Sequence, residues 1–245
     1  MPLVDAEPTI HFNPRPRVSL VRGHEGALCV VVDDVLRNPE VLRDWACAQP
    51  LTAPQGYPYP GLVAPVPASL NALLEENFNI HVRGRLGARR TVDLTARVSL
   101  VTTPPAQLRP VQWLCHRDRI AANPREVLFA ASVLYIFDDP ALGGTSLYRP
   151  RRSPQETDRL LLDSQSLDAA AFGARYGLQP GYMTQDNDWF ERTARVEAAY
   201  NRAVFYDGSI FHSADVHEPQ RLSADPRQGR LSINGFYTCK RNAAS

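Results

Sequence analysis

Three consecutive residues, His116-Arg117-Asp118, could supply two ligands to one metal ion. In an extended segment, residues two apart point to the same side, so His116 and Asp118 can reach the same ion while Arg117 points away. Taken alone, a His-x-Asp triplet is common and is equally expected in a polar surface turn. His212 strengthens the interpretation because it ends a largely apolar segment, 203–212, and would complete a set of two histidines and one carboxylate. Such a facial triad leaves metal positions open, as non-haem Fe(II) requires.

A second group of residues could bind a carboxylate. Arg230 and Ser232 share one face of the segment 229–236, in which alternate large apolar residues indicate close packing. A buried guanidinium pairs with a carboxylate through two parallel hydrogen bonds, which would suit the distal carboxylate of 2-oxoglutarate. The alternative is a solvent-facing arginine on an edge strand. Arg221 lies closer to His212 in the sequence, but its proline-containing polar surroundings indicate a loop over the site.

The order of these motifs resembles a known enzyme superfamily. His-x-Asp, a strand with a double glycine, a histidine and Arg-x-Ser follow one another as in the Fe(II)/2-oxoglutarate-dependent oxygenases, with most similarity to the prolyl-hydroxylase-like branch. The resemblance covers roughly residues 90–240. Within it, 133–139 and 143–148 look like the second core strand of the family and the turn and strand that follow, and 30–39 looks like the N-terminal strand and helix of that branch.

The resemblance implies a double-stranded β-helix that binds Fe(II), 2-oxoglutarate and O2. It implies that His116, Asp118 and His212 hold the metal. It also implies that a tyrosine at a position like that of Tyr135 helps to hold the cosubstrate carboxylate, together with Arg230 and Ser232. The predicted metal and cosubstrate residues are therefore His116, Asp118, His212, Arg230, Ser232 and Tyr135.

The implied reaction is a hydroxylation that releases succinate and CO2. The metal-binding carboxylate favours this outcome, because many halogenases of the wider family lack it. Four residues near the motifs in sequence could contact a substrate, although core packing or a solvated rim explains them equally well: Trp113, Tyr148, Arg149 and His217. Two alternatives stay open, a cupin-like metal-dependent dioxygenase that does not use 2-oxoglutarate and an inactive binding module on the same fold.

The pattern of apolar segments predicts a mainly β fold with flanking helices, of the jelly-roll or cupin-like type. A single domain is expected over 1–245, with a loose arm over 1–17, an N-terminal α/β part over about 18–90 and a β-helix core over about 91–240. Ser153-Pro154-Gln155-Glu156 is a helix-start signature, which predicts a helical insertion over 153–178. Residues 50–67 are rich in proline, tyrosine and glycine and indicate an extended loop.

Composition narrows the function classes. Lys and Arg total 27 against 26 Asp and Glu, a net charge of +1, which gives no sign of a nucleic-acid partner. Neither a signal peptide nor a membrane-spanning segment is expected, and the four scattered cysteines are typical of reduced thiols in a cytoplasmic protein. The expected partner is a small-molecule or peptide substrate. The identity of the substrate and the oligomeric state cannot be predicted from the sequence.

Overall fold

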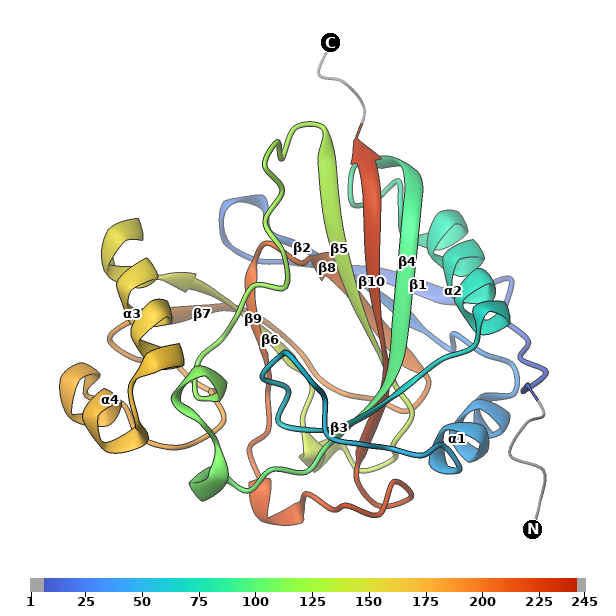
Figure 1. Ribbon diagram of the computed structural model, residues 1–245. Coiled ribbons are helices and arrows are strands. Elements are labelled where there is room, and N and C mark those ends of the chain that lie inside the picture. Colours follow the sequence, from blue (N-terminus) through green and yellow to red (C-terminus); the bar gives the residue numbers. More distant parts are fainter. Residues whose placement is uncertain (1–6, 242–245) are drawn as a thin grey trace.

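The computed structural model describes residues 7–241, which form two antiparallel sheets with helices on both sides (Figure 1). The larger sheet has the order β1-β2-β8-β5-β10-β4-β3, and the smaller has the order β7-β6-β9. The strands of the larger sheet are β1 (Arg17–Arg22), β2 (Leu28–Asp33), β3 (Gly61–Pro65), β4 (Ala88–Val101), β5 (Val127–Tyr135), β8 (Arg202–Asp207) and β10 (Arg230–Arg241). Those of the smaller sheet are β6 (Thr145–Pro150), β7 (Phe190–Val196) and β9 (Phe211–Ala214). The chain is therefore mainly β, as the sequence predicts.

Three apolar clusters fill the spaces between the layers. The first joins the outer face of the larger sheet to α1 (Pro39–Cys47) and α2 (Ala68–His81). The second lies between the two sheets, and the third joins the outer face of the smaller sheet to α3 (Pro154–Ser166) and α4 (Ala169–Tyr176). Helices thus cover both outer faces, and the space between the sheets is left for the second cluster and the polar residues described below (Figure 1).

Alternation along the strands decides which side chains reach the space between the sheets. On β10 the odd-numbered residues Leu231 and Ile233 belong to the outer cluster, so Arg230 and Ser232 point inward. On β4 the same alternation turns Arg97 inward. Because β4 pairs with β10 in antiparallel register, the inward residues of the two strands lie side by side.

Local sequence signals account for the helix starts. Asn38 is the N-cap of α1 and Pro39 occupies its first turn, where the missing N–H of proline has no cost. The Ser153 hydroxyl accepts a hydrogen bond from the backbone N–H of Glu156, and the Glu156 carboxylate accepts one from the backbone N–H of Ser153. This capping box begins α3, so two helices occupy the segment in which the sequence predicts a helical insertion.

Two strands differ from the sequence prediction. The segment predicted to be an extended loop contains β3, which pairs with the edge of the larger sheet at β4. Its last residue, Pro65, is compatible with an edge strand because an edge residue needs no donor on its open side. β1 is a further strand that the sequence does not predict, since half of its residues are polar, most are exposed, and the backbone pairing with β2 defines it.

All four cysteines are free thiols, three of them buried. Within residues 7–241, none of the helices has both the length and the apolar character that a bilayer crossing requires.

Candidate metal centre

The three predicted metal ligands are brought together by backbone pairing at the edge of the smaller sheet. The backbone N–H of His116 donates to the His212 carbonyl at 2.9 Å, and the N–H of His212 donates back to the His116 carbonyl at 2.8 Å. Two residues on, the N–H of Asp118 donates to the Gly208 carbonyl at 2.9 Å. The segment 116–118 is thus held beside β9 in extended form, and this pairing places ligands from distant parts of the chain next to one another.

One ligand atom from each of His116, Asp118 and His212 lies within 4.8 Å of those of the other two. Nε2 of His116 is 3.5 Å from Oδ1 of Asp118, and Nε2 of His212 is 3.3 Å from Oδ2 of the same carboxylate. Metal–nitrogen and metal–oxygen bonds of about 2.0–2.2 Å place neighbouring ligands about 3 Å apart, so these side chains need only small shifts to share one ion. The arrangement therefore fits a divalent metal held by two imidazoles and one carboxylate.

Neighbouring groups fix the orientation of His212. Its Nδ1–H donates to the carbonyl of Ile210 at 2.8 Å, because a carbonyl can only accept, and this bond turns Nε2 toward Asp118 and the proposed metal position. The ring of Tyr206, on β8, packs against the imidazole with a centroid distance of 4.6 Å. His212 is nearly buried, whereas the His116 side chain is 56% exposed, so the site opens on the His116 side.

The electrostatics of the cluster suit a cation. Burial opposes ionisation of Asp118, but the two histidines outweigh this effect and bring the pKa of the carboxyl well below its usual range. Burial and the neighbouring His212 lower the pKa of His116. Burial would also lower the pKa of His212, yet the Asp118 carboxylate outweighs it and raises that pKa. The site therefore offers an ionised carboxylate and a neutral His116 imidazole, the protonation states that metal binding requires.

The residues around the triplet point elsewhere, as the alternation predicts. The Arg117 guanidinium lies 3.8 Å from Asp158 of α3 and 4.5 Å from the ring centre of Phe211. Cys115 is fully buried in the cluster beneath α3 and α4.

Arg230 lies deep between the sheets and is only 4% exposed. Its Nε donates to the carbonyl of Gly143 at 3.0 Å and its Nη2 to the carbonyl of Gly144 at 2.7 Å, while within residues 7–241 no hydrogen bond uses Nη1. Its Cζ lies 5.8 Å from the ring centres of both Tyr135 and Phe137. Among the described residues no carboxylate pairs with this guanidinium. A buried cation without a counter-ion is costly, so this end of the space suits an anion.

The other two predicted cosubstrate residues border the same region but already have protein partners. The Ser232 hydroxyl donates to Oδ1 of Asn234 at 2.8 Å, and the hydroxyls of Tyr135 and Thr145 are 2.7 Å apart. Burial raises the pKa of Tyr135 to about 12, which keeps its hydroxyl a hydrogen-bond donor at neutral pH. Arg221 lies outside this region, where it is half-exposed and pairs with Asp139.

The four predicted substrate residues have their polar groups engaged away from the triad. Trp113 donates from Nε1 to the Leu108 carbonyl, and the Tyr148 hydroxyl donates to the Met183 carbonyl. Both rings belong to the cluster under α3 and α4, which lies on the opposite face of the smaller sheet from His212. Arg149 pairs with Glu191 and also contacts His24.

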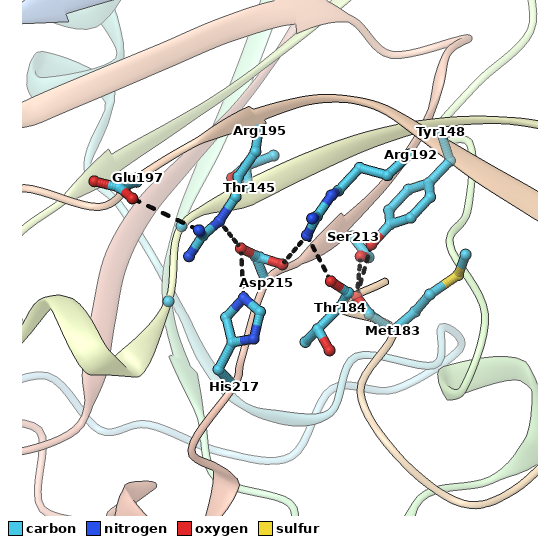
Figure 2. Close-up of polar contacts among 12 residues, drawn as sticks. Thr145, Tyr148, Met183, Thr184, Arg192, Arg195, Glu197, Ser213, Asp215 and His217 are labelled. Carbon is cyan, nitrogen blue, oxygen red and sulfur yellow. Dashed lines mark hydrogen bonds and ion pairs between the residues drawn. The ribbon is translucent and has the colours of Figure 1, made fainter. Parts of the chain in front are cut away.

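His217 belongs to a separate network on that outer face (Figure 2). Its Nε2 is 3.0 Å from Oδ2 of Asp215, a fully buried carboxylate that also pairs with Arg195 and lies 3.7 Å from Arg192. Figure 2 shows these side chains converging on Asp215 from β7 and from the segment after β9. The network braces the chain next to the Gly143-Gly144 turn, because the Asp215 N–H donates to the Gly144 carbonyl.

Three inward-facing residues beside the site were not singled out from the sequence. They are Arg97 and Ser99 of β4 and Tyr59, which precedes β3. Nε of Arg97, Oγ of Ser99 and Oη of Tyr59 are all buried without a hydrogen-bond partner among the described residues. The signal that points to them is the alternation over 95–102, which turns Arg97 and Ser99 away from the outer core.

The solved structures that resemble this chain are distant from it in both sequence and structure. The nickel- and 2-oxoglutarate-bound structure of HygX from Streptomyces hygroscopicus shares 8% identity at a TM-score of 0.46, over 86% of this chain and 82% of that chain. SnoK, a non-haem alpha-ketoglutarate-dependent carbocyclase from nogalamycin biosynthesis, shares 14% identity at a TM-score of 0.41, over 86% and 79%. The epimerase SnoN from the same biosynthesis shares 12% identity at a TM-score of 0.42, over 89% and 82%. At TM-scores this low, such similarity assigns neither residue roles nor a reaction.

No curated protein matches the sequence. A family model matches residues 14–237, nearly the whole chain, and the protein thus belongs to DUF6445, a family of unknown function.

Proposed function

We propose that this protein is an Fe(II)- and 2-oxoglutarate-dependent dioxygenase that hydroxylates an organic substrate and releases succinate and CO2. The observation that carries the proposal is the convergence of His116, Asp118 and His212, whose ligand atoms lie within 4.8 Å of one another. Two imidazoles and one carboxylate leave positions open on the metal, as Fe(II) oxygenases require.

The unpaired guanidinium of Arg230 supports 2-oxoglutarate as the cosubstrate. Its bonds to the Gly143 and Gly144 carbonyls fix its orientation, and Nη1 is left to donate to a carboxylate oxygen. Tyr206 extends from the metal ligands toward this end of the space. Its ring contacts His212. Burial raises the pKa of Tyr206 well above its usual value, and the charges of Asp118 and Arg230 also act on that pKa. A dicarboxylate could therefore span from the metal to Arg230.

When bound, Fe(II) would supply the coupling of 2-oxoglutarate decarboxylation to substrate oxidation by O2. The tasks of the chain are binding and exclusion of water. Asp118 and the two histidines hold the ion, and Ile210 keeps the His212 lone pair directed toward it. The aromatic rings of Tyr135, Phe137 and Tyr206 lie between the sheets, where they shield the cosubstrate end from solvent.

Several finer assignments belong to the same proposal. The two facing antiparallel sheets support a double-stranded β-helix, and membership of the prolyl-hydroxylase-like branch stays a prediction. So do the single domain over 1–245, the cytoplasmic location and a small-molecule or peptide substrate in place of nucleic acid.

The test is an anaerobic titration of the purified protein with Fe(II) and 2-oxoglutarate, followed in the visible spectrum. We expect a weak charge-transfer band that appears only when both are present and that is lost in Asp118→Ala. Absence of the band, with iron demonstrably bound, would contradict the cosubstrate assignment and favour a metal-dependent dioxygenase without an oxo-acid. If the band forms but no candidate substrate increases succinate release, the alternative of an inactive binding module gains support.

A further inference from the structure

Arg97 is a cation held in an aromatic frame without a counter-ion. Its Cζ lies 4.5 Å from the ring centre of Tyr57, 5.3 Å from that of Tyr59 and 4.9 Å from that of Phe236. Among the described residues it forms neither an ion pair nor a hydrogen bond, and its Nε is buried without a partner. Ring contacts stabilise a guanidinium but leave its N–H groups unsatisfied, so the frame alone does not complete this site.

Two buried hydroxyls near the guanidinium also have unsatisfied hydrogen-bonding capacity. Oη of Tyr59 and Oγ of Ser99 are buried and approach each other, but neither has another hydrogen-bond partner among the described residues. Ser99 is two residues from Arg97 on the inward face of β4. Most buried polar atoms in folded proteins are hydrogen-bonded, and three unsatisfied ones in a single cluster indicate a ligand. One cation and two hydroxyls match the needs of a carboxylate, which accepts hydrogen bonds at both oxygens.

The strand register places this cluster on the inner face of the larger sheet, the face that also carries Tyr206 beside the metal centre. Phe236, which Arg97 contacts, pairs with Ala131 of β5, and Ala131 pairs with Tyr206 of β8. These residues form one row across the inner face of the larger sheet, and the ring of Tyr206 at its end contacts His212.

Arg97 and Arg230 differ in how a ligand can reach them. Arg230 is buried at the far end of the inner space, whereas Arg97 is partly exposed. Arg97 and Tyr57 also line a shallow, open surface hollow of about 410 Å³, whose other lining residues come from 52–55, 63–65 and 96 and not from Tyr59 or Ser99. Arg119 adds a second cation, since it lies 4.3 Å from the ring centre of Phe129 on the inward face of β5 and forms no ion pair among the described residues. A ligand arriving from outside therefore meets unpaired positive charge first.

We infer that Arg97, Tyr59 and Ser99 form a carboxylate-binding subsite for the organic substrate. The subsite adjoins the cosubstrate end at Arg230, because Ser99 pairs with Ser232, but its own cation is Arg97. This inference rests on the proposed function and specifies its substrate as a molecule that carries a carboxylate. The carboxylate binds Arg97 and the two hydroxyls, and the rest of the molecule extends toward His116, on the open side of the metal centre.

The test uses the full-length protein loaded with Mn(II) and saturating 2-oxoglutarate, with sodium benzoate as the probe. Benzamide, which has nearly the same shape and no charge, is the matched control. Mn(II) broadens the proton resonances of any molecule that binds near it, so one titration reports both affinity and closeness to the metal. We expect benzoate to bind at least about tenfold more tightly than benzamide, as charge-assisted hydrogen bonds predict.

Three variants test which residues cause the preference for benzoate over benzamide. Arg97→Gln should remove most of the difference between benzoate and benzamide and leave the 2-oxoglutarate affinity within about twofold of wild type. Arg90→Gln removes the same charge from an exposed position of the same strand and should change neither affinity. Tyr59→Phe removes only a hydroxyl whose one polar neighbour among the described residues is Ser99, so it should fold normally and weaken benzoate binding a few-fold.

Equal binding of benzoate and benzamide by wild type would overturn the inference, as would an unchanged preference in Arg97→Gln. A loss of 2-oxoglutarate binding in Arg97→Gln as large as that in Arg230→Gln would also overturn it, because Arg97 would then hold the cosubstrate. Failure of wild type to bind Mn(II) or 2-oxoglutarate, measured beforehand by electron paramagnetic resonance and calorimetry, would instead contradict the proposed function.

Discussion

The guanidinium of Arg230 and the backbone carbonyl of Gly144 form a 2.7 Å hydrogen bond that joins the larger sheet to the first residues of the smaller one. The same carbonyl accepts a hydrogen bond from the backbone N–H of Asp215. Gly144 is therefore hydrogen-bonded both to Arg230, between the sheets, and to the segment that follows β9. The affinity of Arg230 for an anion should therefore depend on the position of this turn.

Gly144→Ala should disrupt the turn. A Cβ on Gly144 would lie 1.9 Å from the Val196 carbonyl oxygen, which belongs to the backbone of β7 and cannot move away as a side chain could. We expect a loss of about 3 kcal/mol or more in the free energy of unfolding, measured by urea denaturation. Gly84→Ala is the control, because open space surrounds Gly84 and the change there should stay within about 0.5 kcal/mol. Comparable stabilities of the two variants would contradict this account of the turn.

Arg230→Gln tests the cosubstrate end. Loss of the buried cation should weaken 2-oxoglutarate binding about tenfold or more, while Mn(II) affinity changes little, both measured by calorimetry. Arg221→Gln removes an arginine that is half-exposed and paired with Asp139, and it should leave 2-oxoglutarate affinity unaltered. If Arg221→Gln has the larger effect, the cosubstrate anchor is wrongly assigned. If Arg230→Gln keeps full activity, the enzyme does not depend on an oxo-acid.

Asp118→Ala should abolish tight metal binding. Asp118 is the only ionised ligand of the proposed set and approaches both histidines, at 3.5 and 3.3 Å. Because loss of residues that merely support a ligand costs about 10–100-fold in metal affinity, loss of this carboxylate should cost at least about 100-fold. Titration with Mn(II), followed by electron paramagnetic resonance, measures the change. Asp158→Ala removes a nearby but mostly exposed carboxylate, and an equal loss in that variant would argue against the triad.

The closeness of His116 and Asp118 could be predicted from sequence because it depends on local geometry. His116 and Asp118 point to one side because they lie two residues apart in an extended segment. The pairing of this segment with β9 brings His212 beside them. The same alternation explains why Tyr148, although near the motifs in sequence, points away from His212. Tyr148 pairs with Phe211, the neighbour of His212, and a shift of one residue turns a side chain to the opposite face of the sheet.

Features that depend on distant partners could not be predicted in this way. β3 is only five residues long and ends in a proline, and it is a strand only because the edge of β4 is available for pairing. The buried state of Arg230 follows from alternation, but its bonds to Gly143 and Gly144 require the fold of both sheets. The frame around Arg97 combines rings from the segment before β3 and from β10, which no local pattern connects.

The pairing of α3 with α4 through Asp163 should make stability depend on pH. The Asp163 carboxylate accepts a 2.6 Å hydrogen bond from the Tyr176 hydroxyl and lies 3.1 Å from both Arg159 and Arg175. The Tyr176 hydrogen bond is the largest cause that lowers the pKa of Asp163, and the two arginines add to it. A carboxyl whose pKa is lower in the folded state stabilises the fold above its unfolded pKa of about 3.9 and loses that contribution as the pH falls through the folded value.

Asp163→Asn should therefore be less stable than wild type at pH 7, and the difference should shrink as the pH falls below about 3.9. Urea denaturation of both proteins across this range measures the effect. Asp158→Asn changes an exposed carboxylate on the same helix, 3.8 Å from Arg117, and should differ little from wild type at any pH. A pH-independent difference between Asp163→Asn and wild type would mean that the side chain acts through its shape and hydrogen bond to Tyr176, not through its charge.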